Sequence, residues 1–112
     1  MGMEVDCLVI AGEKSGEEHA MTFVPHLKEK LNLNLWGVGG EDLSSLGMEL
    51  LYHHKDFSSM GFSEVIGKIP FYIRAMNRIV DEVKRRGTKV AILVDFQSFN
   101  LKLAKKLSKL GV

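Results

Sequence analysis

The 112-residue sequence has little of what marks several large classes of protein. Its single cysteine, Cys7, excludes an internal disulfide, and we interpret it as a small core residue in a reducing compartment rather than a reactive thiol. A formal net charge of only +1 gives no reason to expect nucleic acid as a partner. No apolar run approaches the roughly 20 residues that span a bilayer, and the start lacks the pattern of a signal peptide. Any membrane contact is therefore expected to be peripheral.

What the sequence does contain is an alternation of apolar runs and stretches with helical spacing. This alternation predicts one α/β domain with a Rossmann-like parallel sheet, in which the first and last strands lie side by side near the middle. Strands are expected at 5–11, 33–38, 48–52 and 90–94, and helices from Ser15 onward, at 41–46, at 70–86 and at 99–110. Residues 53–59 are expected to form a loop.

Two local signals shape the first helix. Ser15 and Glu18 match a capping box, so the helix is predicted to start at Ser15. Pro25 conflicts with a continuous helix, because a proline in a helix interior removes a hydrogen bond and costs about 3 kcal/mol. We therefore expect a kink, or a helix that restarts near Phe23.

The last strand carries a further expectation. Residues 90–94 are apolar throughout, as in a central strand, yet no strand follows to cover their outer edge. The chain closes on Gly111 and Val112, which resemble a helix cap and the first residue of another strand. The sequence thus predicts a truncated, partial domain over 1–112.

The turn after the first strand is the first candidate site, because ligands of parallel α/β sheets bind beyond the carboxyl ends of the strands. Gly12 and Gly16 allow close backbone approach to a ligand, and Glu13 could hydrogen-bond sugar hydroxyls or position a base. The segment is not a phosphate-binding loop, and Glu13 and Glu17 would oppose a bare phosphate. From pattern alone, a tight turn before a well-capped helix is the favoured reading.

The second candidate is Asp95, which closes the strand at 90–94. An acidic residue there is placed where a general base belongs, but it could equally cap the following helix, and the pattern leaves both readings open. Residues 37–40 are most simply a turn. His53 and His54 lack ligand spacing to another His or Cys, so no metal site is predicted.

The segment 57–73 carries more apolar residues than one buried face needs. Lys68 and Arg74 flank its second half, which suits a membrane-contacting patch or a groove for acyl chains. Packing against the sheet explains the same pattern, and both readings stay open.

Four segments taken in order, 10–16, 37–40, 60–65 and 94–101, resemble the lipid-A-disaccharide synthase family over essentially the whole chain. The resemblance implies a GT-B glycosyltransferase with two Rossmann-like domains, of which this chain is the N-terminal part and lacks the UDP-binding domain. It implies no metal or cofactor. It also implies transfer of diacylglucosamine from UDP-diacylglucosamine to diacylglucosamine 1-phosphate, on the cytoplasmic face of the inner membrane.

The same resemblance implies roles for individual residues. Asp95 becomes the candidate general base, with Glu13 as a second catalytic residue. Substrate-binding residues are Gly12, Ser15, Gly16, Met60, Gly61 and Asn100, and lipid- or membrane-contacting residues are Phe62, Val65, Ile66, Ile69, Tyr72 and Ile73.

The chain also departs from the family's pattern. Glu17 stands where the family usually has Asp, and Gln97-Ser98 where it typically has Pro-Asp, which removes a second carboxylate near the site. Two alternatives remain: a non-catalytic module that holds acylated sugar or membrane, and a small nucleotide- or phosphate-binding domain of flavodoxin type.

Overall fold

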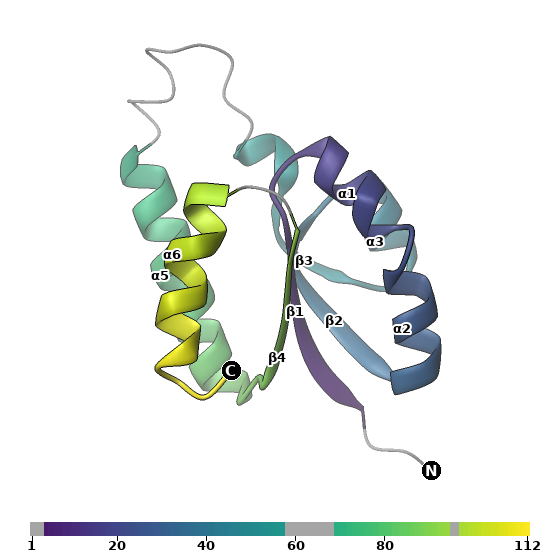
Figure 1. Cartoon of the computed structure of the whole chain (residues 1–112). Helices are drawn as coiled ribbons and strands as arrows, with labels where there is room; N and C mark the ends of the chain where they lie inside the picture. The colour runs from purple at the N-terminus through teal and green to yellow at the C-terminus, as the bar shows by residue number, and fades with distance from the viewer. Residues whose placement is uncertain (1–3, 58–68, 95–96) are drawn as a thin grey trace.

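The computed structural model of the chain describes residues 4–57, 69–94 and 97–112, and the side chains of residues 69, 97 and 98 are outside that description (Figure 1). It contains a sheet of four parallel strands in the order β3-β2-β1-β4. The strands are β1 (Val5–Ala11), β2 (Leu33–Gly39), β3 (Glu49–His53) and β4 (Val90–Val94). The predicted Rossmann-like α/β arrangement is confirmed, and so is the pairing of the first strand with the last.

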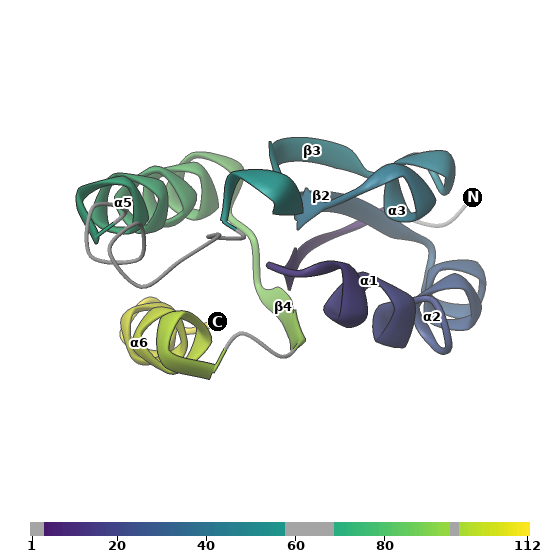
Figure 2. The same ribbon diagram turned by 90° about the horizontal axis from the view of Figure 1, so that it is seen from above.

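Helices cover both faces of the sheet, as the view from above shows (Figure 2). The helices α1 (Lys14–Ala20), α2 (Val24–Leu31) and α3 (Glu41–Ser45) lie on one face, and α5 (Ile69–Arg86) and α6 (Gln97–Ser108) on the other. Strand β1 supplies both cores: Cys7 and Val9 face α1 to α3, whereas Leu8 and Ile10 face α5 and α6. None of the helices in the described ranges is long and apolar enough to cross a membrane.

The start of α1 differs from the prediction. Glu13 is the N-cap residue, with extended backbone and no side-chain capping bond, and Ser15 is already inside the helix. The predicted capping box of Ser15 and Glu18 is therefore wrong. The first helical hydrogen bond runs from the backbone N–H of Glu17 to the carbonyl of Glu13 at 3.0 Å, so the helix begins before Ser15.

The break at Pro25 is confirmed. Helix α1 ends at Ala20, and α2 restarts with Phe23 as its N-cap and Pro25 in its first turn. Proline costs little there, because the first backbone N–H groups of a helix have no partner within the helix.

The remaining boundaries agree with the prediction to within a few residues. Gly47 and Gly87, at φ 91° and φ 70°, follow α3 and α5, because the left-handed conformation that ends a helix suits glycine. Helix α5 begins at Ile69, so Pro70 is its second residue, and α6 begins at Gln97. The expected loop at 53–59 includes a short 3-10 helix, η1 (His54–Asp56).

Strand β4 lies at the edge of the sheet, and none of the described strands pairs with its outer side. Val90 is 40% exposed, and Ala91, Ile92 and Leu93 are only partly buried, whereas the apolar side chains Leu8, Val9 and Ile10 of β1 are fully buried. Strand β4 has the apolar sequence of a central strand, but its side chains are less buried than those of a central strand such as β1.

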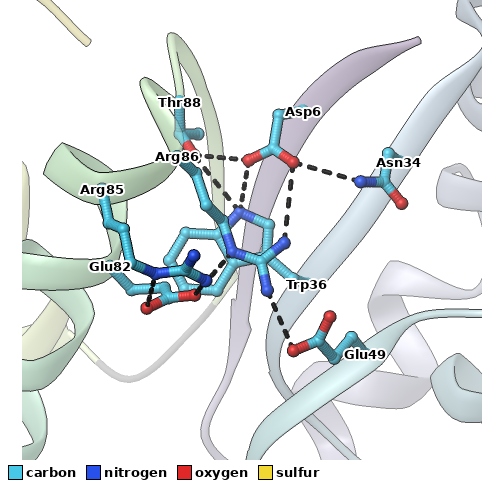
Figure 3. A network of polar contacts seen from close by, with 8 residues as sticks. All are labelled: Asp6, Asn34, Trp36, Glu49, Glu82, Arg85, Arg86 and Thr88. Atoms are coloured by element: carbon cyan, nitrogen blue, oxygen red, sulfur yellow. Dashed lines mark hydrogen bonds and ion pairs between the residues drawn. The ribbon is translucent and has the colours of Figure 1, made fainter.

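At the amino ends of the strands, a polar network centres on Asp6 of β1 (Figure 3). Its carboxylate accepts hydrogen bonds from Trp36 Nε1 at 2.8 Å and from Thr88 Oγ1 at 2.5 Å. The Arg86 guanidinium lies 4.8 Å from the centre of the Trp36 ring and pairs with the carboxylates of Asp6 and Glu49. The network joins β1 and β2 to the end of α5, at the edge of the sheet opposite the strands' carboxyl ends.

Candidate active site at the carboxyl edge of the sheet

The candidate site lies where the four strands end. Because all strands are parallel, Ala11, Gly39, His53 and Val94 close their strands at one edge of the sheet. The segments that follow β1, β2 and β3 meet at this edge, and α5 and α6 both begin there (Figure 1). This is the edge at which open α/β sheets bind ligands.

The turn between β1 and α1 brings two predicted site residues to the surface of this edge. Glu13 and Ser15 are exposed, whereas Gly12 and Gly16 are buried beneath them. Gly16 packs on both β1 and β4, because a Cβ at this position would lie 3.7 Å from the Cα of Ala11 as well as near Val94. The turn thus holds an exposed carboxylate and an exposed hydroxyl at the end of β1.

Glu17, one turn into α1, is the main feature of the site that sequence reasoning missed. Its side chain is 3% exposed, and Oε2 accepts hydrogen bonds from the backbone N–H of Gly40 at 2.6 Å and of Leu43 at 3.0 Å. These are the N-cap and third-residue N–H groups of α3, where a negative charge is favourable. Its other oxygen, Oε1, lies 3.5 Å from Nε2 of the buried His54.

Gly40 lies between these side chains. A Cβ on Gly40 would be 2.5 Å from His54 Nε2 and 2.6 Å from Glu17 Oε1. The backbone of Gly40 is extended, at φ −140° and ψ −155°, so it is the space that requires glycine rather than the dihedral angles. The glycine-rich segment at 37–40 is therefore more than a turn, because its last residue admits a buried carboxylate and an imidazole.

Glu41, His53 and His54 form the one group among the described residues whose side chains could hold a metal ion, with ligand atoms within 4.8 Å of one another. The hydrogen bonds oppose this use of His53. Its Nδ1 accepts from the backbone N–H of Lys55 at 3.1 Å, so the neutral ring carries its hydrogen on Nε2, 3.2 Å from Glu41 Oε2. A metal ligand needs a free nitrogen lone pair. The contacts fit a hydrogen-bonded pair of His53 and Glu41. A backbone hydrogen bond, and then the hydrogen bond with His53, lower the pKa of Glu41.

Asp95, the predicted general base, lies outside the described residues. On either side of it, Val94 closes β4 and Gln97 opens α6. Asn100, a predicted substrate-binding residue, is 8% exposed in the first turn of α6 beside the buried Phe99. The side chain of Asn100 thus belongs to the interior of this end of the fold rather than to its surface.

The predicted lipid-contacting segment is described only in part. Met60, Gly61, Phe62, Val65 and Ile66 lie outside the described residues, as does the side chain of Ile69.

Of the remaining residues of that segment, Ile73 is 57% exposed on α5. Leu101, which lies outside the segment on α6, is 67% exposed. Tyr72 is committed inward: its hydroxyl donates to the carbonyl of Phe57 at 2.8 Å, and the two rings stack with centres 5.9 Å apart. Within the described part of the segment, Tyr72 thus packs inside the fold and Ile73 lies at the surface.

A comparison with known families and proteins places the chain. The family described as lipid-A-disaccharide synthetase matches residues 7–112. The chain is 42% identical over 106 residues to lipid-A-disaccharide synthase of Myxococcus xanthus and 38% identical over 106 residues to that of Anaeromyxobacter dehalogenans. A third relative of the same name, from Koribacter versatilis, is 32% identical over 108 residues. Each alignment covers 94% of this chain and 28% of the relative, so the chain spans little more than a quarter of the relatives' length.

Proposed function

Because this chain belongs to the lipid-A-disaccharide synthetase family, we propose that it forms the acceptor-side part of a GT-B glycosyltransferase of lipid A biosynthesis. The observation that carries the proposal is the match over residues 7–112, combined with the position of Glu13 and Ser15 at the ligand edge of the sheet. The proposed reaction transfers 2,3-diacylglucosamine from UDP to 2,3-diacylglucosamine 1-phosphate. The products are lipid A disaccharide 1-phosphate and UDP.

The proposed chemistry is a single displacement that inverts the anomeric centre. A carboxylate removes the proton of the acceptor's 6-hydroxyl. The oxygen of that hydroxyl then attacks the anomeric carbon of the donor, and UDP leaves with the electron pair of the broken bond. We assign the base to Asp95. Glu13, exposed at the end of the neighbouring strand β1, is the second catalytic residue and would hydrogen-bond sugar hydroxyls, with Gly12, Ser15 and Gly16 forming the floor beside it.

The buried carboxylate of Glu17 supports an acceptor side rather than a nucleotide side. A helix N-terminus at the end of a strand is where α/β folds bind phosphate, through unpaired backbone N–H groups. In α3 the N–H groups of Gly40 and Leu43 are already bonded to Glu17. The Glu17 carboxylate therefore occupies the N-terminus of α3, which counts against a flavodoxin-type domain that would bind a phosphate at this helix. The UDP site is proposed to lie outside these residues.

The substrates carry acyl chains, so the proposal includes peripheral contact with the cytoplasmic face of the inner membrane. The exposed apolar side chains of Ile73 and Leu101 on α5 and α6 support it, because both helices begin at the ligand edge. The other residues proposed for lipid contact, Phe62, Val65 and Ile66, lie outside the described residues.

The decisive test is a chimera in which this chain replaces the matching N-terminal residues of the Myxococcus xanthus enzyme. We expect disaccharide formation from the two diacylglucosamine substrates, and a loss on the order of 10²-fold or more in kcat for Asp95→Asn, since general bases contribute typically 10²–10⁴-fold. Asp81→Asn, an exposed carboxylate on α5, is the control. A folded chimera without activity would contradict the proposed function, and near-normal turnover of Asp95→Asn would remove Asp95 from the base role.

A second candidate, a module that binds acylated sugar or membrane without catalysis, is favoured by the exposure of Ile73. Liposome co-sedimentation separates it from a nucleotide-binding domain: Ile73→Asp should weaken binding to vesicles. Asn77→Asp adds the same charge to an exposed position of α5 one turn later and should leave binding unchanged. Binding by an inactive chimera would favour the module, and no binding at all would count against both lipid-linked readings.

A further inference from the structure

The junction of Glu17, Gly40 and His54 is a feature that the proposed function does not require. It connects three separate segments at the ligand edge: the first turn of α1, the start of α3 and the start of η1. A carboxylate in a residue that is 3% exposed is costly unless it is bonded, and here Oε2 accepts two hydrogen bonds from backbone N–H groups while Oε1 lies 3.5 Å from His54 Nε2.

We propose that Glu17 is a positioning residue, which holds Glu13 and Ser15 at the distance from the ends of β2 and β3 that the acceptor sugar needs. The inference rests on the proposed function. Glu17 acts through the backbone of its own helix turn, since its N–H donates to the carbonyl of Glu13 at 3.0 Å. Anchoring the Glu17 side chain to α3 therefore fixes the turn that carries Glu13.

The side chains of Glu17 and His54 pack closely against Gly40. A single added carbon at Gly40 would collide with both Glu17 and His54, although the extended backbone of Gly40 would accept any residue. The ends of the Glu17 and His54 side chains are thus in close contact with the residue that precedes α3. A positioning role needs this kind of coupling, because in enzymes a misplacement of about 1 Å at a distance from the chemistry can cost 10²-fold in rate.

The test uses the Myxococcus xanthus chimera and measures kcat and KM per folded molecule, at a temperature where circular dichroism shows every variant folded. Glu17→Ala should lower kcat on the order of 10²-fold with a smaller change in KM. Glu17→Gln should stay within about threefold of the parent, because one amide oxygen can accept from both N–H groups as Oε2 does now.

The matched control is Asp6→Ala, which removes a carboxylate with several hydrogen bonds at the opposite edge of the sheet. It should lower the melting temperature and leave kcat per folded molecule unchanged. If Glu17→Ala behaves like Asp6→Ala, Glu17 is merely structural and the inference is overturned. The inference also fails if Glu17→Gln is as slow as Glu17→Ala.

Two further outcomes keep the proposals apart. Should Glu17→Ala fail to fold, Gly40→Ala tests the same coupling without removing a polar group, and an unchanged kcat in that variant would overturn the inference. An inactive but folded parent chimera would instead sink the proposed function itself. An active parent with a normal Glu17→Ala would sink only the positioning role.

Discussion

At the scale of single residues, burial decides what each ionisable group can do. Glu13 and Glu17 are four positions apart at the start of α1. Glu13 is nevertheless exposed at the ligand edge, whereas Glu17 is buried and hydrogen-bonded inside the fold. In the sequence, the two residues look alike, because both are acidic and lie next to a glycine. Only their surroundings make one available to a substrate and the other a link between segments.

Cys7 is a second example, and it leads to a prediction about pH. Burial, and then the neighbouring charge of Asp6, raise the pKa of the Cys7 thiol from its ordinary value of 9.0 to about 11. Between these values the unfolded chain releases the thiol proton and the folded chain keeps it, so the free energy of unfolding falls as pH rises from 9 to 11. Below pH 9 the thiol makes no such difference.

Urea unfolding at pH 8 and pH 10 checks this, with Cys7→Ala as the reference that lacks the thiol. The stability advantage of the parent over Cys7→Ala should shrink by about 1 kcal/mol at pH 10, from the size of the pKa difference. The same thiol should resist a disulfide reagent at pH 8 until the chain unfolds. Rapid labelling of the folded protein would contradict the interpretation of Cys7 as a core residue.

At the scale of secondary-structure elements, the Asp6 network attaches α5 to the sheet. Helix α5 packs on the sheet through its buried residues Ala75, Ile79 and Val83. The polar contacts that hold its last turn could not be predicted, because Asp6 and Thr88 are 82 positions apart and meet only when β1 pairs with β4.

Asp6→Ala should lower the free energy of unfolding by about 1–3 kcal/mol, because Trp36 Nε1 and Thr88 Oγ1 lose the carboxylate that accepts their hydrogen bonds. Denaturant titration measures the change. Asp81→Ala, which removes an exposed carboxylate from α5, is the matched control and should change stability by less than about 0.5 kcal/mol. Equal effects of the two substitutions would mean that the network contributes no net stability.

The break between α1 and α2 shows what element-scale prediction does well and where it fails. Pro25 constrains its own backbone, so its consequence was readable from one residue. The start of α1 was predicted wrongly, because the capping signal at Ser15 is not used and Glu13 is the N-cap. A proline that fixes its own backbone was thus a better guide to a helix boundary in this chain than a side-chain capping motif.

At the scale of the whole molecule, β4 is one of the two edge strands of the described sheet, and none of the described strands pairs with its outer side. Such an edge offers unpaired backbone groups to another chain, and apolar side chains make pairing more favourable. We predict that the 112-residue chain on its own self-associates through β4, with a sedimentation coefficient that rises with concentration.

Val90→Lys should reduce this association, because a lysine at a 40% exposed edge position opposes pairing with a second copy. Asn77→Lys, on exposed helix α5, adds the same charge elsewhere and should have no effect. A chain that stays monomeric at all concentrations would show that the edge is already protected.

By itself, the sequence determined the α/β class, the order of strands and helices, the restart at Pro25 and the edge at which Glu13, Ser15 and Asp95 were expected. These follow from periodicity, from residues that constrain their own backbone, and from four motifs in order. The tertiary structure alone decided that Glu17 is buried against α3 and His54, that Gly40 makes room for both, and that Tyr72 turns inward while Ile73 does not. The physical reason is that burial and hydrogen bonding depend on which distant segments become neighbours, and that is settled only when the sheet assembles.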